Sequence, residues 1–270
     1  MIEVEVDQLV HEYPGGVRAL DGITLHIGAG ESVALIGQNG SGKTTFVRHL
    51  NRLLRPTSGQ VRIGGADAAG RRVGELAAQV GLVFQEPDRQ IFAGTVRGEV
   101  EFGPRNLGLR GEALEAAVQA ALTAVGLTGE EATNPYDLGA SRRKLLAVAS
   151  VLAMGTPVLV LDEPTTGQDR IGVNRIRQLV TDARAAGRTV IAVSHDLRFV
   201  AETFERVVVL RGGRVVLDET PARAFASGQW QALRDTGLEP PMAAVLGARL
   251  GYASVATEEA LVAAMAATAA

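Results

Sequence analysis

Hydrophobic and polar positions alternate near the start of the chain, and this alternation predicts antiparallel strands. Residues 2–6 alternate, and Ile23, Leu25 and Ile27 repeat the pattern further on. We therefore expect residues 2–28 to form antiparallel strands.

Three later runs are apolar at every position, which is typical of parallel strands that are buried on both faces. They cover residues 33–36, 158–161 and 190–193. Between the second and third runs, Ile176 and Leu179 are followed by Val180 on the same face of a helix, which predicts a βαβ crossover. The expected fold class is therefore α/β, with a parallel-sheet core.

Residues 86–155 change to a helical pattern, which predicts a helical subdomain inserted into this core. Apolar residues recur at helical spacing from Leu114 to Val125, Gly126 ends them, and a second helix fits residues 142–154.

The last part of the chain divides into a hairpin and a helical extension. Two short apolar runs at residues 207–210 and 215–217 are joined by Arg-Gly-Gly-Arg, which predicts the hairpin. Residues 1–220 are thus expected to form the main domain. Residues 221–270 are Ala-rich and are broken by Pro240-Pro241, so they predict a small helical extension and a candidate dimer contact.

A glycine-rich segment at residues 37–45, Gly-Gln-Asn-Gly-Ser-Gly-Lys-Thr-Thr, lies between an expected strand and an expected helix. In this context the pattern GxxxxGK[ST] predicts a phosphate-binding loop, and a purely structural turn is the alternative. Glycines let backbone N–H groups approach a phosphate, and the helix adds the positive end of its dipole. Lys43 supplies a cation for the β- and γ-phosphates, and Thr44 supplies a hydroxyl ligand for magnesium. The expected nucleotide-binding residues of this segment are Gly37, Asn39, Gly40, Ser41, Gly42, Lys43, Thr44 and Thr45.

Two carboxylates and a histidine follow the second and third parallel strands. Asp162 is placed to hold magnesium, and Glu163 is placed to deprotonate an attacking water. His195 is placed to polarise or sense the γ-phosphate. All three lie at the carboxyl ends of parallel strands, where open α/β sheets bind ligands. The alternative is that they are solvated strand ends.

Composition narrows the classes of function. The chain has 270 residues, 46% apolar content and a net charge of −3, so it can bury a core but carries no basic footprint for nucleic acid. It has no cysteine, which excludes disulfides and thiolate metal sites. Its acidic, alternating start is not typical of a signal peptide, and the apolar stretch at 145–161 is interrupted by Gly155, Thr156 and Pro157. We therefore expect any membrane role to depend on a partner.

These motifs resemble the ATPase subunits of ATP-binding-cassette transporters over residues 1 to about 220. The resemblance implies a P-loop NTPase core with an antiparallel N-terminal β-subdomain, and it implies ATP and Mg2+ as ligands. It also implies roles for three more residues. Gln85 occupies the position of the Q-loop glutamine, which contacts magnesium and acts in catalysis, and Asp169 occupies that of the D-loop aspartate. Tyr13 occupies the position of an aromatic residue that stacks on adenine, with packing under the N-terminal sheet as the alternative.

Within this family the chain is most similar to energy-coupling-factor ATPases, which drive vitamin and cobalt or nickel uptake. The similar stretches are residues 13–16, 84–92 and 102–109, together with the tail that contains Pro240-Pro241. We expect residues 87–92 and 95–102 to contact the membrane partner through apolar side chains, unless these only pack the subdomain. The side chains are those of Ile91, Phe92, Val96, Val100 and Phe102.

One family motif departs from its usual form. Members of the family carry a Leu-Ser-Gly-Gly-Gln signature, whose serine and backbone N–H groups close on a γ-phosphate bound by the opposite subunit. Here Gly139, Ala140 and Ser141 follow Leu138, so the usual serine is absent. In the D-loop, Gln168 stands where leucine is usual. The basic cluster at residues 142–144 is explained either by a facing polyphosphate or by solvation.

The chain's own phosphate loop and acids are complete, whereas the part it would offer across a dimer is altered. We therefore expect a different ATPase subunit as its partner, with a homodimer as the alternative. The expected function is Mg-ATP hydrolysis at the cytoplasmic face of the membrane, driving uptake of a vitamin or transition-metal ion. A transmembrane coupling subunit and a substrate-binding membrane subunit would be the further partners. The alternatives are a soluble non-transport ABC ATPase and a dimer-completing subunit with little hydrolysis.

Overall fold

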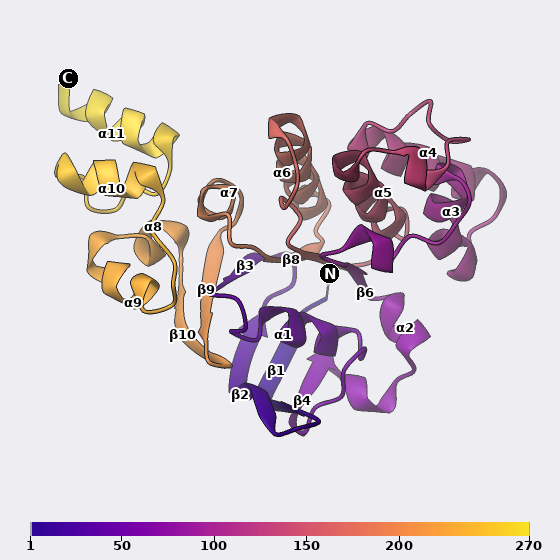
Figure 1. Cartoon of the computed structure of the whole chain (residues 1–270), viewed down its shortest axis with the longest axis horizontal. Helices are drawn as coiled ribbons and strands as arrows, with labels where there is room; N and C mark the ends of the chain where they lie inside the picture. The colour runs from indigo at the N-terminus through magenta and orange to yellow at the C-terminus, as the bar shows by residue number, and fades with distance from the viewer. Residues whose placement is uncertain (1, 270) are drawn as a thin grey trace.

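The computed structural model describes residues 2–269, and its centre is a six-stranded sheet (Figure 1). In spatial order the strands are β10 (Arg214–Glu219), β9 (Arg206–Arg211), β3 (Ser32–Ile36), β8 (Thr189–Val193), β7 (Val158–Asp162) and β6 (Val80–Val83). Neighbours from β9 to β6 are parallel, and β10 is antiparallel to β9. The three predicted parallel strands are confirmed. The predicted hairpin is confirmed as well, and because β9 pairs with β3 it belongs to the core sheet.

Both faces of this sheet are buried, which explains why its strands have no polar position. Leu159 and Leu161 belong to one hydrophobic cluster, whereas Val158 and Val160 belong to the other. Since successive side chains of a strand point to opposite faces, each cluster takes alternate residues.

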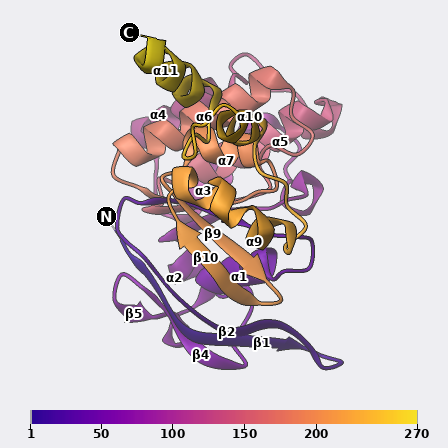
Figure 2. The same cartoon turned by 90° about the vertical axis from the view of Figure 1, so that its left-hand side faces the viewer.

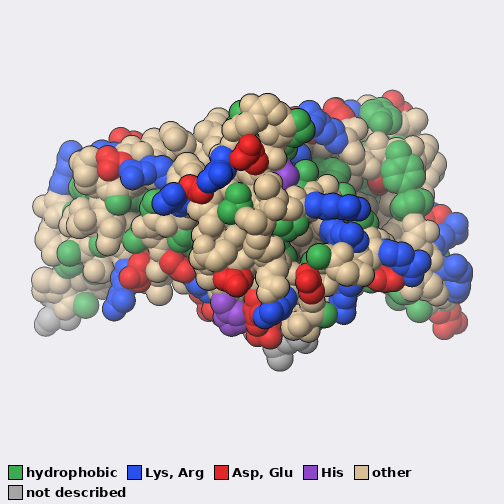
Figure 3. All heavy atoms as spheres, turned by 90° about the horizontal axis from the view of Figure 1, so that it is seen from below, with side chains coloured by type: hydrophobic (Ala, Val, Ile, Leu, Met, Phe, Trp, Pro, Cys, Tyr) green, Lys and Arg blue, Asp and Glu red, His purple; other side chains and the backbone are tan. Residues whose placement is uncertain are grey.

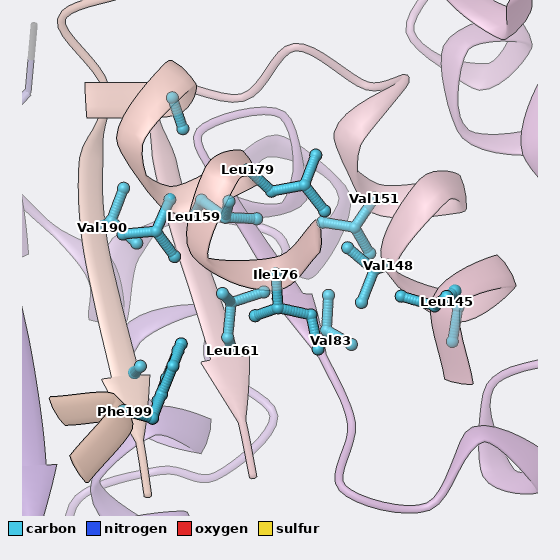
Figure 4. Packing of buried hydrophobic residues seen from close by; sticks show 14 of the residues in the cluster. Val83, Leu145, Val148, Val151, Leu159, Leu161, Ile176, Leu179, Val190 and Phe199 are labelled. Carbon is cyan, nitrogen blue, oxygen red and sulfur yellow. The ribbon is translucent and has the colours of Figure 1, made fainter. Parts of the chain in front are cut away.

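Helices cover one face of the sheet. The predicted crossover helix α6 (Arg170–Ala185) connects β7 to β8, and α7 (Leu197–Thr203) follows β8. Figure 4 shows Ile176 and Leu179 of α6 over Leu159 and Leu161, with α5 (Ala140–Leu152) beside them. Two residues of the crossover helix, Ile176 and Val180, have no exposed surface. The apolar stripe predicted for α6 is therefore the face that packs on the sheet.

The other face packs on α1 (Lys43–Leu50) and on a second, four-stranded antiparallel sheet. Its order is β2 (Val17–Ile27), β1 (Val4–Tyr13), β4 (Ser58–Ile63) and β5 (Ala66–Asp67), and α2 (Val73–Ala77) leads from it to β6. A 3-10 turn at Ala68–Gly70 separates β5 from α2. The N-terminal antiparallel strands are confirmed, and β4 and β5 add two strands that were not predicted. Phe46 of α1 is 1% exposed in the cluster between the two sheets.

The helical subdomain lies at one end of the molecule and consists of α3 (Val96–Asn106), α4 (Gly111–Val125) and α5 (Figure 1). As predicted, Gly126 ends α4, in the left-handed conformation with φ of 68°. Helix α3 was not predicted, because Gly98, Gly103 and Pro104 interrupt its pattern. Short 3-10 turns at Pro87–Arg89 and Pro135–Asp137 precede α3 and α5.

The C-terminal helices lie at the opposite end of the molecule (Figures 1 and 2). They are α8 (Pro221–Ala224), α9 (Trp230–Arg234), α10 (Met242–Arg249) and α11 (Glu258–Ala269), with a 3-10 turn at Ser227–Gln229. The predicted interruption at Pro240-Pro241 is confirmed, since α10 begins at the next residue. An ion pair of 3.2 Å between Arg198 and Glu258 links α11 to α7.

Two surface properties bear on partners. Across residues 2–269, none of the helices has the length and the apolar character needed to span a membrane. On the face shown in Figure 3, basic and acidic side chains are interspersed, and neither sign dominates.

Candidate active site

The phosphate loop follows β3 directly and ends in the first turn of α1. Gly37 and Gly42 have φ of 146° and 104°, which other residues adopt only with strain. A Cβ at Gly37 would lie 2.2 Å from the carbonyl oxygen of Leu210, and one at Gly42 would lie 2.5 Å from that of Ala19. The loop therefore needs glycine at these positions both for its conformation and for its close packing.

Lys43 lies inside this loop. Its Nζ donates to the carbonyl oxygens of Gly37, at 2.6 Å, and of Gln38, at 3.0 Å. Burial lowers the pKa of Lys43, and the nearby charges of Glu163 and Asp162 act in the opposite direction. A cation is thus held at the centre of the loop, facing the two carboxylates.

Asp162 ends β7 next to the first turn of α1. The hydroxyl of Thr44 donates to its Oδ1 at 3.2 Å, and the residue is 3% exposed. Burial raises the pKa of the Asp162 carboxyl, the charge of Glu163 raises it further, and the bond from Thr44 lowers it. A carboxylate and a hydroxyl at this spacing are the oxygen ligands that Mg2+ prefers, so these side chains fit a magnesium site.

Glu163 is buried and is held by a histidine. Its Oε2 lies 2.7 Å from Nδ1 of His195, and its backbone N–H donates to the carbonyl of Val193 at 2.9 Å. Its φ is 50°, a conformation that costs energy in a residue with a side chain. The turn after β7 therefore fixes the position of the Glu163 carboxylate. Backbone strain of this kind is concentrated at functional sites.

A cavity of about 210 Å³ lies where these residues meet. It is lined by Asn39, Gly40, Ser41, Gly42, Lys43, Thr44, Thr45, Gln85, Glu163 and Val193. The structure thus brings the loop, Gln85 and Glu163 together. Asp162 is hydrogen-bonded to Thr44 of the loop, and His195 is hydrogen-bonded to Glu163. A phosphate chain held by the loop would lie beside a buried carboxylate, and this arrangement suits phosphoryl transfer to water.

The comparisons with known proteins agree with this geometry. A model of the ABC transporter family matches residues 20–166, which is more than half of the chain. The energy-coupling factor transporter ATP-binding protein EcfA of Methanocaldococcus jannaschii is 41% identical over 248 residues, which cover 91% of this chain and 88% of that protein. The chain belongs to the ABC transporter family. It is an ABC ATPase, and the resemblance predicted from its motifs is confirmed.

Other relatives of this ABC ATPase differ in length and in name. An ABC transporter ATP-binding protein of Caldanaerobacter subterraneus is 40% identical over 256 residues, and the chain spans 45% of that protein's length. The solved structure of cbiO1 from Clostridium perfringens, part of the ABC transporter complex cbiONQ, has a TM-score of 0.75 at 34% identity. That similarity covers 86% of this chain and 93% of cbiO1. The P-loop NTPase fold of the ABC ATPases, predicted from the sequence, is confirmed by this structure.

Tyr13 lies at the edge of the phosphate loop. Its hydroxyl is 3.1 Å from Oγ1 of Thr45, and its ring packs edge-on against His11, with 4.6 Å between ring centroids. Behind it, Nε2 of His49 lies 3.2 Å from Nδ1 of His11, and Nδ1 of His49 donates to the carbonyl of Thr45 at 2.7 Å. Stacking of Tyr13 on adenine stays a prediction.

The altered signature begins α5, and it lies outside the lining of the cavity, as does Asp169. Gly139 is the N-cap residue and provides no side-chain cap. The hydroxyl of Ser141 donates to Oε1 of Gln168 at 3.0 Å, and Nε2 of Gln168 returns a bond of the same length to the carbonyl of Ser141. Asp169 caps α6 by accepting from Gly172 N–H at 2.7 Å. The two departures from the family pattern, at the signature and in the D-loop, are thus in direct contact.

The basic cluster at residues 142–144 does not form a single cationic surface. Arg142 pairs with Glu130 at 2.8 Å, and Arg143 pairs with Asp88 at 3.2 Å. Lys144 is only 3% exposed and fits neither a facing polyphosphate nor solvation, so both explanations were wrong for this residue. Its ammonium instead donates to backbone carbonyls at Phe84, Gln85 and Asp162. Burial lowers the pKa of Lys144 to about 8.

Sequence reasoning missed Lys144 as a residue of the site. The one available signal was a lone lysine followed by the apolar run at 145–149, which placed it at the start of a buried helix face. That signal did not indicate which carbonyl groups would accept hydrogen bonds from the Lys144 ammonium.

Proposed function

We propose that this chain is the ATP-hydrolysing subunit of an energy-coupling-factor type importer, and that it drives uptake of a vitamin or a transition-metal ion. The observation that carries the hydrolytic part is the buried Glu163 carboxylate, held by His195 beside the cavity of the phosphate loop. The importer type is supported by the EcfA relatives and by cbiO1.

Each side chain has a role in this proposal. The phosphate loop and Lys43 bind the triphosphate of ATP. The oxygen atoms of Thr44, Asp162 and Gln85 fit Mg2+, which when bound neutralises the phosphate oxygens. Glu163 takes the proton of the attacking water while His195 keeps the carboxylate in place. Tyr13 stacks on the adenine.

We assign contact with the transmembrane coupling subunit to the surface after Gln85, in a narrower form than the sequence predicted. Ile91, Val96 and Val100 are buried in the core cluster, so for these three the alternative holds and they pack the subdomain. Phe92 and Phe102 are 61% and 49% exposed and stack edge to face, with 4.7 Å between their centroids. An exposed aromatic pair of this kind suits a partner that buries it.

The ATPase partner in this proposal is a second, different subunit. Gly139 has no hydroxyl, and the hydroxyl of Ser141 is already bonded to Gln168 of its own chain. Across a dimer interface, α5 would therefore present only its backbone N–H groups and the positive end of its dipole to a phosphate bound by the other subunit. A partner with an unaltered signature would complete the site on this chain's loop. The exposed Met242 and Leu246 of α10, with Leu250 directly after it, give the C-terminal extension a surface for the same dimer.

The membrane components are a transmembrane coupling subunit and a substrate-binding subunit, so the chain would work peripherally at the cytoplasmic face. The proposal is tested by co-expressing the chain with its neighbouring genes and purifying the product through an affinity tag on this chain. ATP turnover of the purified complex is then measured. A complex with an ATPase and two membrane proteins supports it. A fully active homodimer that binds no membrane protein would favour a soluble ABC ATPase. An active-site Glu163→Gln variant with normal turnover would favour a dimer-completing subunit.

A further inference from the structure

The backbone of Phe84 and Gln85, between β6 and the cavity, is held by two side chains from outside the core sheet. Oε1 of Gln90 accepts from the backbone N–H of Phe84 at 3.0 Å, and Nζ of Lys144 donates to its carbonyl at 3.2 Å. The same ammonium donates to the carbonyl of Gln85 and, at 3.4 Å, to that of Asp162. Lys144 thus joins two segments that are far apart in the sequence and that both reach the cavity.

Both side chains are anchored on α5. Lys144 belongs to this helix, and Nε2 of Gln90 donates to the carbonyl of Ala147 at 2.8 Å and to the hydroxyl of Ser150 at 3.0 Å. We call Lys144 and Gln90, with their bonds to Phe84 and Gln85, the Q-loop clamp. Gln90 also lies in the segment proposed to meet the membrane partner.

Burying an ammonium group costs free energy unless the group is hydrogen-bonded, so the buried position of the Lys144 ammonium indicates a role for its hydrogen bonds. The chain has two lysines, Lys43 and Lys144, and the charges of Asp162 and Glu163 act on the pKa of both, against the effect of burial. Lys43 belongs to the phosphate loop. Lys144 lies outside the lining of the cavity and reaches it only through the carbonyls it bonds.

We propose that Lys144 and Gln90 are positioning residues that fix Gln85 against the end of β7 and so set its side chain at the cavity. This inference rests on the role proposed above for Gln85 at magnesium and the γ-phosphate. The clamp therefore connects α5 to the backbone of Gln85 through side-chain hydrogen bonds.

The test compares Lys144→Met and Gln90→Leu with wild type in the purified ATPase pair. Turnover, the KM for ATP and the Mg2+ concentration for half-maximal activity are measured. Since a misplacement of about 1 Å can lower a rate by about 100-fold, we expect kcat to fall by about 10- to 100-fold. The KM should stay within about threefold, because the phosphate loop is untouched, and the Mg2+ requirement should rise.

Arg188→Met is the matched control. Arg188 is a half-buried cation that donates to the carbonyl of Thr156 at 2.6 Å. Thr156 lies two residues before β7, at the opposite end of the strand from Asp162. The loss of Arg188 should lower the melting temperature while kcat and the Mg2+ requirement stay at the wild-type values. An equal loss of kcat in Arg188→Met would show that damage to the core explains the Lys144 effect, and it would overturn the inference.

A double variant shows whether the clamp acts through Gln85. The combination of Lys144→Met with Gln85→Ala should be no slower than Gln85→Ala alone, and multiplied losses would overturn the inference. Normal kcat and Mg2+ dependence in Lys144→Met would also overturn it and leave the proposed function intact. Normal turnover in Gln85→Ala would instead remove the proposed role of Gln85. If Lys144→Met does not fold, Gln90→Leu and Gln90→Glu test the same clamp from its other side.

Discussion

Nδ1 of His195 lies 2.7 Å from Oε2 of Glu163, and the bond joins an exposed side chain to a buried one. The side chain of His195 is 61% exposed, whereas that of Glu163 is 8% exposed. The histidine therefore holds the carboxylate from the solvent side, and the turn after β7 holds it from the protein side. A base that is fixed in this way loses little freedom when it acts on water.

Glu163→Gln should cut steady-state ATP turnover by about 100- to 10,000-fold, which is the range for removal of a positioned general base. ATP binding should remain, because the amide keeps the shape of the side chain and Lys43 is untouched. Turnover is measured with the partner subunit present. Glu202→Gln is the control, since Glu202 is a mostly buried carboxylate on α7 that pairs with Arg177. Turnover of Glu163→Gln within a factor of three of wild type would remove Glu163 from the mechanism.

Lys43→Ala should weaken nucleotide binding itself, because it removes the cation held inside the phosphate loop. A charged hydrogen bond contributes about 1.5–3 kcal/mol, so the affinity should fall by about tenfold or more. Titration with a fluorescent ATP analogue measures this loss. Lys144→Met is the matched control, because it removes the other lysine and should leave the Kd within about threefold. An unchanged Kd for Lys43→Ala would show that the triphosphate is bound elsewhere.

Tyr13→Ala should weaken ATP binding by about 1–3 kcal/mol, the range for base stacking on an aromatic ring. Tyr13→Phe loses only the contact with Thr45, and Tyr13→Trp keeps a stacking surface, so both should bind ATP with nearly wild-type affinity. The same fluorescent titration compares the three variants. If Trp and Ala lose the same affinity, Tyr13 acts by packing against His11 rather than by stacking.

Much of this site was predictable because local sequence determines it. The glycines of the phosphate loop, the strand end at Asp162 and Glu163 and the strand end at His195 are short patterns whose context is also visible in the chain. The strand β6 was harder to predict, since its run contains Gly81. That glycine is required by packing, because a Cβ there would lie 2.6 Å from Cγ1 of Val151.

The rest of the site depends on contacts between segments that are distant in the sequence. Nothing near Lys144 indicates that its ammonium meets the carbonyls of Gln85 and Asp162, since that requires α5, β6 and β7 to be packed together. The bonds between Ser141 and Gln168 were hidden for the same reason. Both departures from the family pattern were visible in the sequence, but their contact was not.

The stability of the protein should fall as the pH is lowered through the range where His49 is protonated. Burial lowers the pKa of His49, and the charge of His11 lowers it further. The unfolded chain, with the ordinary histidine pKa near 6.5, therefore binds more protons than the folded chain as the pH falls below that value. Stability from this residue is present above about pH 6.5 and is lost below it, with a slope of at most about 1.4 kcal/mol per pH unit.

Urea unfolding of wild type and His49→Gln between pH 5 and 8 measures this dependence. The variant should be less stable than wild type near pH 8, because it disturbs the bonds to Thr45 and His11. The difference should shrink as the pH is lowered, since only wild type loses stability through His49. A difference that stays constant with pH would show that His49 is not the titrating group.

The altered signature leads to a prediction about the two ATP sites of the proposed heterodimer. A Cβ at Gly139 would have no atom within 4 Å, and the backbone there is extended, so Gly139→Ser can restore the usual serine. Serine at an N-cap position also stabilises a helix, so the variant should fold at least as well as wild type. Restoring this donor should change turnover of the complex little, because it repairs only the site on the partner's phosphate loop.

The two glutamate variants then decide whether the sites are unequal. One lost transition-state donor is worth about 100- to 1,000-fold in rate, so the site that faces Gly139 should contribute little to total turnover. Glu163→Gln in this chain should therefore abolish most hydrolysis, and the matching change in the partner should cost much less. Steady-state hydrolysis by the two complexes, at equal nucleotide occupancy, gives the comparison. Equal losses would mean that the backbone N–H groups at the start of α5 suffice for catalysis. The asymmetric pair would then be wrong, while the assignment as an ABC ATPase would stand.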